Sequence, residues 1–168
     1  MLGRQGLPRV KGSMAVTTTS LSAWLMLVTG GLFTGVIWTV AVERVNLWRR
    51  MPVEQYVVDF QRSVRRVDPL QPIMGTVCAV GAVVFAINSQ GRPATLAWIA
   101  VGLIAVIMVA SFVIAEPMNF RFRRLPEGQA PEGAAEMRTK WRRFHYARCA
   151  VALAVLACLA AAITTAAA

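Results

Sequence analysis

The sequence predicts an all-α integral membrane protein, a bundle of four transmembrane helices with one additional cytoplasmic amphipathic helix. The chain of 168 residues is 57% hydrophobic and has a mean hydropathy of +0.54, which is too apolar for a soluble domain of this size. Four stretches of 20 residues or more lack Asp, Glu, Lys and Arg: 12–42, 69–91, 93–115 and 149–168. A helix of about 20 residues crosses the roughly 30 Å hydrocarbon core of a bilayer.

We divide the chain into an N-terminal tail, residues 1–19, and a single membrane domain, residues 20–168. The elements expected in this domain are spans at about 20–42, 69–89, 94–115 and 147–167, an amphipathic helix at 53–67 and a flexible Pro/Gly-rich loop at 125–133. The last helix is expected to begin near Ala134 and continue into its span without interruption by Pro or Gly. The third span is expected to end at EPMN, residues 116–119, where Pro117 disfavours helical geometry at Glu116.

The N-terminus allows two interpretations. Basic residues precede the first apolar stretch, as in a signal peptide, but the stretch is longer than the roughly 7–15-residue core of such peptides. We therefore expect a retained helix. Met14 is a second candidate for the first residue, and the sequence does not decide between Met1 and Met14.

Apolar side chains recur at helical spacing in the segment between the first two spans. Val53, Tyr56, Phe60 and Val64 are separated by Glu, Gln, Asp and Arg residues, a pattern typical of an amphipathic helix. Such a helix either lies at the membrane surface or caps the bundle.

The distribution of charge predicts the orientation. With four spans, the segments 43–68 and 116–148 lie on one side of the membrane and contain 14 of the 18 basic residues. The positive-inside rule places that side in the cytoplasm and both termini outside the plasma membrane. The net charge of +10 therefore indicates orientation and contact with membrane lipid, and no nucleic-acid partner is expected.

Small residues in the spans suggest packing rather than chemistry. Gly31 and Gly35 form a GxxxG pair, which lets a second helix approach closely, and we expect this contact inside the bundle rather than in a dimer. Cys78, Cys149 and Cys158 have no ligand spacing, so we expect neither a disulfide nor a thiolate metal site.

Polar residues gather where the spans meet the predicted cytoplasmic face. The segment 141–148 reads WRRFHYAR and holds the only histidine. Trp141, His145 and Arg148 share one helical stripe because they lie at i, i+4 and i+7. The other helices contribute polar residues at their ends: Glu43, Asp68, Glu116 and Asn119. Such a convergence favours a polar pocket at the mouth of an apolar bundle, although Trp and Arg are also the usual interfacial anchors of membrane helices.

Several kinds of chemistry are disfavoured. A single histidine without an HxxxH or ExxH pattern argues against a haem, di-iron or zinc centre. No nucleotide-binding or serine-hydrolase motif occurs, and no charge lies in mid-span, which disfavours an ion-coupled transporter. No metal site is expected, and an enzyme built on this chain is expected to work without a tightly bound cofactor or to take one from elsewhere.

Pro117-Met118-Asn119 after the third span, and Trp141, His145 and Arg148 at the start of the fourth, resemble the anthrone-oxygenase-like family of small four-helix bacterial membrane proteins. The resemblance covers about residues 20–165. It implies a cofactor-independent oxygenase that removes a proton from a phenolic ketone and lets the carbanion react with O₂.

The resemblance also implies roles for residues. His145 would be the general base and Arg148 and Asn119 the partners of the enolate oxygen. In the substrate site, Trp141 would be a stacking wall, and Glu43 or Glu116 would orient the imidazole. A second hypothesis from a different class is a non-catalytic accessory or assembly subunit, packed in a larger membrane complex or a homo-oligomer.

Overall fold

The computed structural model describes residues 10–67 and 69–167, and within them the chain is helical with short connections and no strand. The elements in chain order are α1 (Val10–Thr39), the π-helix η1 (Val40–Val45), α2 (Asn46–Arg50), α3 (Val53–Val67), α4 (Leu70–Ile87), α5 (Arg92–Ala110), the π-helix η2 (Ser111–Ala115), α6 (Glu116–Arg123) and α7 (Ala134–Ala167).

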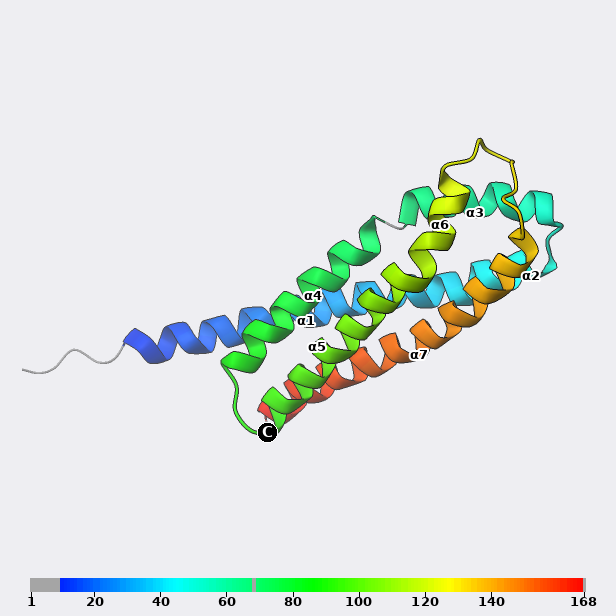
Figure 1. Ribbon diagram of the computed structural model, residues 1–168. Helices are drawn as coiled ribbons and strands as arrows, with labels where there is room; N and C mark the ends of the chain where they lie inside the picture. The colour runs from blue at the N-terminus through cyan, green and yellow to red at the C-terminus, as the bar shows by residue number, and fades with distance from the viewer. Residues whose placement is uncertain (1–9, 68, 168) are drawn as a thin grey trace, which may run out of the picture.

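Four candidate membrane spans are long and apolar enough to cross a membrane: Thr18–Arg50, Val53–Ile87, Arg92–Arg123 and Ala134–Ala167. This confirms the predicted all-α class with four spans. The second of these ranges contains α3, α4 and Asp68, which lies outside the described residues. α1 packs against α4 and α7, and α5 packs against the same two helices, so the four helices form a closed bundle. One end of the bundle, which we call the capped end, carries α2, α3, α6 and the start of α7 (Figure 1). The α4–α5 turn and the C-terminus lie at the other end (Figure 1).

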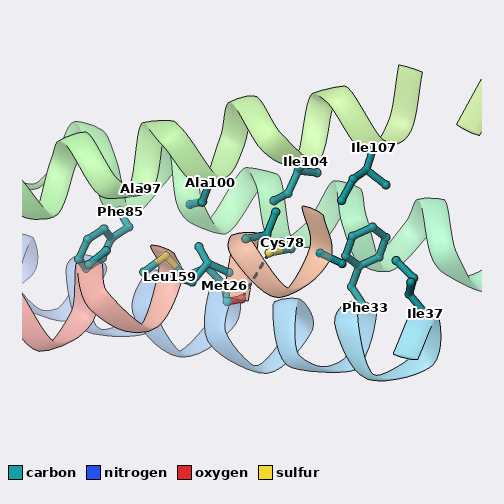
Figure 2. Close-up of a cluster of buried hydrophobic side chains, with 14 of the residues drawn as sticks. Met26, Phe33, Ile37, Cys78, Phe85, Ala97, Ala100, Ile104, Ile107 and Leu159 are labelled. Atoms are coloured by element: carbon teal, nitrogen blue, oxygen red, sulfur yellow. Dashed lines mark hydrogen bonds between the residues drawn. The ribbon is translucent and has the colours of Figure 1, made fainter. Parts of the chain in front are cut away.

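The core of the bundle combines aromatic and small side chains. Figure 2 shows Phe33 of α1 and Phe85 of α4 among aliphatic side chains, and it shows Ala97 and Ala100 of α5 in the same cluster. Two buried hydrogen bonds cross between helices. The Cys78 thiol donates to the carbonyl of Met26 over 3.4 Å, drawn as a dashed line in Figure 2. The Thr34 hydroxyl donates to the carbonyl of Ala152 over 3.1 Å. These bonds satisfy polar groups where no water is present to do so.

The first helix is longer than expected. α1 begins at Val10, inside the segment assigned to the tail, while residues 1–9 lie outside the described part. The helix also continues past residue 42 through η1 and α2. The predicted end marked the loss of apolar residues, but a helix ends only where its backbone pattern is broken. Here Met51 adopts an extended conformation (φ −71°, ψ 144°), as the residue before a proline prefers.

The third helix also continues where the sequence predicted its end. Glu116 is helical (φ −62°, ψ −41°), and α6 extends to Arg123, so the expected stop at Pro117 is wrong. Proline lacks an N–H and its ring crowds the carbonyl four residues earlier. The π-helical turn η2 directly precedes α6, and its wider spacing accommodates the proline without ending the helix.

α3 spans the residues that the periodicity predicts and buries its apolar face at the capped end. Its buried side chains include Tyr56, Val57, Phe60 and Val64. Tyr56 and Phe60 join an aromatic cluster with Trp48, Phe122 and Trp141, with ring centroids 4.7–5.9 Å apart. Edge-to-face pairs of this kind each stabilise a fold by about 0.5–1.5 kcal/mol. Of the two expected placements of α3, these contacts support the cap.

The Pro/Gly-rich connection between α6 and α7 is irregular, as expected, and one buried side chain anchors it. Gln61 of α3 donates through Nε2 to the carbonyls of Phe122 and Pro126, at 2.9 and 3.2 Å. Its Oε1 accepts from the backbone N–H of Gly128 at 2.9 Å. The glutamine is fully buried, so the connection is fastened to α3 rather than free to move at its middle.

The glycines at which helices approach each other closely are not the ones that the sequence predicted. A Cβ added to Gly31 or Gly35 would meet nothing within 4 Å, so the expected close helix contact at this GxxxG pair is wrong. The close approaches occur at other glycines. A Cβ at Gly81 would lie 3.0 Å from the backbone nitrogen of Met26, so this glycine allows α4 to approach α1. The three cysteines are separate free thiols.

Candidate functional site

The stripe predicted on the last helix faces the interior of the bundle. Trp141, His145 and Arg148 of α7 are 7%, 0% and 9% exposed. The neighbouring Arg143 points outward and is exposed. A fully buried histidine beside a buried arginine is expensive in an apolar bundle unless each polar group has a partner. The hydrogen bonds of this pair therefore decide what the residues can do.

Both ring nitrogens of His145 are engaged. Nε2 lies 3.0 Å from the carbonyl oxygen of Ile37 in α1, and Nδ1 lies 2.9 Å from Nη2 of Arg148. A carbonyl can only accept and a guanidinium can only donate, so Nε2 carries the proton and Nδ1 accepts. The imidazole is therefore neutral, and its lone pair is held by Arg148. A general base needs that lone pair for the substrate, so this arrangement opposes the predicted role of His145 as the base.

Trp141 connects the histidine to α6 and to the aromatic cluster. Its indole stacks on the His145 ring, with centroids 4.7 Å apart and planes 9° apart. Its Nε1 donates to Oδ1 of Asn119 over 3.1 Å, and Asn119 is buried at 5% exposure. Trp141 therefore fixes two neighbours, the imidazole through stacking and the amide through a hydrogen bond.

Arg148 reaches a small cavity, which we call the polar pocket. The pocket has a volume of about 70 Å³ and its polar lining residues are Gln71, Ser111, Glu116, Asn119 and Arg148. Nη1 of Arg148 lies 3.4 Å from the hydroxyl of Ser111. Apolar side chains, among them Phe33, Met108 and Phe112, complete the lining. His145 and Trp141 do not line this pocket and lie behind Arg148 and Asn119.

The two acidic residues predicted for the site are in different places. Glu116 lines the polar pocket and forms an ion pair with Arg123. Glu43 is not at the site. It lies in η1 beside Arg44, with its side chain 62% exposed and 3.7 Å from that guanidinium, and it lines a separate groove. Neither carboxylate is a hydrogen-bond partner of His145, which Ile37 and Arg148 occupy. Asp68 lies outside the described residues.

Two residues of the site were missed by the sequence analysis. Gln71 is buried at 8% exposure and lines the polar pocket, and Ser111 contacts Arg148. Both lie inside stretches chosen because they contain no charged residue. The sequence did show that each is an uncharged polar residue within an apolar span. Such a side chain needs a hydrogen-bond partner inside the membrane, and this could have indicated that both residues face a polar site.

The π-helix η2 positions one wall of the pocket. Ser111, Ala115, Glu116 and Asn119 all line it, and they span the junction of η2 and α6. A π-helical turn changes the phase of the residues that follow it, and such turns are frequent at functional sites. Ser111, Ala115, Glu116 and Asn119 nevertheless keep helical spacing, so they line the same cavity across this junction.

The apolar helices with a buried polar cluster at one end define a helical multi-pass membrane protein. Residues 60–158 match the family described as anthrone oxygenase, which covers more than half of the chain, so the chain belongs to the anthrone oxygenase family. Comparison with curated proteins and with solved structures gives no match. The matched residues include α4, α5, α6 and the stripe of α7, and they contain every lining residue of the polar pocket except Phe33.

Proposed function

We propose that this protein is a cofactor-independent oxygenase that converts the activated ring methylene of an anthrone-type phenolic ketone to a carbonyl. The observation that carries the proposal is the meeting of Arg148, Asn119 and Glu116 in one pocket of an anthrone oxygenase family member. These side chains supply a cation, an amide and a carboxylate, which are the groups that such a reaction needs.

The roles follow from the contacts. Arg148 and Asn119 face the pocket and stabilise the oxyanion that forms when the ketone enolises. Glu116 is the carboxylate among the described pocket residues. Its Oε1 is bound by Arg123, and its second oxygen accepts the proton from the methylene carbon. His145 holds Arg148 from behind through Nδ1, so it is a positioning residue. Trp141 holds the amide of Asn119 in the same way.

The reaction balances with dioxygen as the oxidant. Glu116 removes one methylene proton, and the resulting enolate passes an electron to O₂. The two radicals combine to a carbon–oxygen bond, and the peroxide takes up a proton. Loss of the second hydrogen from that carbon with cleavage of the O–O bond leaves a new C=O and one molecule of water. Each turnover consumes one O₂ and converts a CH₂ group to a carbonyl.

The polar pocket is too small to hold the fused rings of the substrate, so a second cavity must hold them. A cavity of about 70 Å³ is small beside the roughly 300–1,000 Å³ of typical ligand sites. An apolar groove of about 340 Å³ between α4 and α5 adjoins it, and Met108 lines both. We place the fused rings in this groove and the ketone end in the polar pocket. The groove lies on the outer surface of the bundle, so an apolar substrate reaches it from the lipid.

The direct test is oxygen consumption by the purified full chain with anthrone, corrected for the uncatalysed oxidation. Wild type is expected to consume one O₂ for each anthraquinone formed. Arg148→Met should lower kcat by about 10²–10³-fold, the usual effect of removing an oxyanion donor. Glu116→Gln should lower it by about 10²–10⁴-fold. Glu43→Gln is the matched control, because this carboxylate lies outside the pocket, and it should behave like wild type.

Variants of His145 distinguish a positioning residue from a general base. His145→Gln keeps a hydrogen-bonding side chain behind Arg148, and we expect it to retain more of kcat than His145→Ala. If His145 were the base, both variants would lose activity equally while Glu116→Gln stayed active. A folded wild-type protein that does not accelerate anthrone oxidation would contradict the proposal. Co-purification with other membrane proteins in mild detergent would then favour the accessory-subunit hypothesis.

We also propose that the capped end faces the cytoplasm of a plasma membrane. The support is the concentration of 14 of the 18 basic residues in segments 43–68 and 116–148, as the positive-inside rule requires. A cysteine placed at Ser89, in the α4–α5 turn, should react with a membrane-impermeant thiol reagent in intact cells. A cysteine at Gln129 in the opposite connection should stay unlabelled, and the reverse result would invert the orientation.

A further inference from the structure

A large groove on the described surface lies apart from the polar pocket. It has a volume of about 680 Å³ and is formed between α1 with η1 on one side and α3 on the other. α3 runs back over the end of α1 at the capped end (Figure 1). The groove and the polar pocket share no lining residue, so its function is independent of the proposed oxygenase chemistry.

One half of the groove is apolar and open. Gly31, Leu32, Gly35 and Val36 of α1 line it, and Leu32 is 55% exposed. The two glycines have no neighbour within 4 Å of an added Cβ, so they form a smooth hollow rather than a helix contact. A smooth apolar hollow in a membrane-spanning stretch is suited to a hydrocarbon chain, because the absence of side chains lets the chain lie close to the backbone.

The other half of the groove is charged. Glu43 and Arg44 continue the α1 side, and Asp59, Arg62 and Arg66 contribute from α3. Most of these charges are already paired. Arg44 contacts Asp59 at 3.2 Å, and Asp59 also accepts from Nε1 of Trp48 at 2.6 Å. Arg62 forms an ion pair with Glu127 outside the groove.

Arg66 and Ser63 remain available at this charged half. Within the described residues Arg66 forms no ion pair and the Ser63 hydroxyl forms no hydrogen bond. They lie three residues apart on α3, so they face the same way. A guanidinium beside a hydroxyl is a donor set for a phosphate group. The groove therefore joins an anion-binding end to an apolar hollow.

The groove follows α1 and η1 from Gly31 to Arg44 and α3 from Asp59 to Val67. Asp59 contacts Arg44, and Ser63 and Arg66 lie one and two turns further along α3. A molecule that has a phosphate beside a long hydrocarbon chain is a membrane phospholipid.

We propose that the α1–α3 groove is a specific site for one anionic glycerophospholipid. Its phosphate is bound by Arg66 and Ser63, and an acyl chain lies over Gly31 and Gly35. Arg66, which forms no ion pair within the described residues, favours a lipid with net negative charge over a zwitterionic one, because the positive group of a zwitterionic headgroup would be held near Arg66.

The test is native mass spectrometry of the purified full chain in detergent, titrated with phosphatidylglycerol and phosphatidylcholine of identical chains. Wild type should bind one phosphatidylglycerol, at least about fivefold tighter than phosphatidylcholine. One cation near an anionic lipid surface contributes about 1 kcal/mol, a factor of about five. Arg66→Gln should remove this preference, while Arg65→Gln, an exposed arginine of α3 that does not line the groove, should keep it.

A second pair of variants tests the acyl-chain half. Gly35→Leu places a side chain in the hollow, where an added Cβ meets nothing within 4 Å, and should weaken both lipids by tenfold or more. Gly102→Leu places the same side chain at another glycine without neighbours, outside the groove, and should leave binding unchanged. Equal binding of the two lipids by wild type would overturn the proposal, and so would equal effects of the Arg66 and Arg65 variants. Displacement by inorganic phosphate alone would identify a free-phosphate site and contradict the role of the chain.

Discussion

Nη2 of Arg148 donates to Nδ1 of His145 over 2.9 Å, one turn apart on α7. The same imidazole donates from Nε2 to the carbonyl of Ile37 on α1. His145 therefore links the first and last helices and fixes the guanidinium that faces the polar pocket. The relationship gives the only histidine of the sequence a role in packing as well as in the site.

His145→Ala should destabilise the bundle. The substitution removes two hydrogen bonds and the stack with Trp141, and it leaves a buried cavity, a loss on the order of 3 kcal/mol. Thermal unfolding in detergent measures the effect. Tyr146→Ala is the control, because this neighbouring side chain is 44% exposed and its loss should shift Tm far less. Equal shifts would show that the buried network contributes nothing to stability.

Trp141 and Asn119 should be energetically coupled. Trp141→Phe removes the Nε1 donor and retains an aromatic ring on His145, and Asn119→Ala removes the acceptor. A double-mutant cycle on unfolding free energies should give a coupling of about 1 kcal/mol, the usual net value of one hydrogen bond. Additive effects of the two substitutions would mean that the 3.1 Å contact does not stabilise the fold.

Gly81 and Gly102 should respond oppositely to alanine. A Cβ at Gly81 lies within 3.0–3.3 Å of the Met26 backbone, and backbone cannot move aside, so Gly81→Ala should cost about 1–3 kcal/mol. Gly102 has no neighbour within 4 Å, and Gly102→Ala should be neutral or stabilising by up to about 1 kcal/mol. Unfolding midpoints of the two variants check this, and destabilisation of both to the same extent would show that helix approach is not the cause.

Gln61 should control access to the α6–α7 connection. Gln61→Ala removes three hydrogen bonds that hold this segment, so cleavage by a glutamate-specific protease after Glu127 or Glu132 should accelerate on the order of tenfold. Gln55→Ala changes an exposed glutamine of the same helix and should not alter the rate. Fast cleavage of the wild type would show that the buried glutamine does not fasten the segment.

Much of the fold could be predicted because it depends on composition along the chain. Four uncharged stretches of 20 residues or more predict four membrane-crossing helices, since every backbone polar group must be bonded within its own helix in hydrocarbon. The continuous helix from Ala134 and the bounds of α3 followed from the absence of Pro and Gly and from apolar periodicity. The helix continues past the predicted span end at residue 42, because helical hydrogen bonding continues where apolarity stops. The expected loss of helical geometry at Glu116 was wrong, because a π-helical turn accommodates Pro117.

Part of the candidate site could also be predicted. Helical spacing places Trp141, His145 and Arg148 on one stripe, and the stripe is buried as a unit. Position along the chain could not tell that Glu43 faces a different groove while Glu116 faces the polar pocket. Gln71 and Ser111 are uncharged, so the search for charged residues did not find them. Only their contacts in the folded structure show that they belong to the pocket.

The sequence by itself determined which segments cross the membrane and which residues of each helix share a face, because the membrane thickness and the helical repeat fix these properties locally. The tertiary structure decided which faces meet. Each residue turns a helix by about 100°, and the π-helices η1 and η2 add a further change of phase. The rotation of one helix against another is set by side-chain packing across the bundle. For that reason only the structure placed Arg148 between His145 and the pocket.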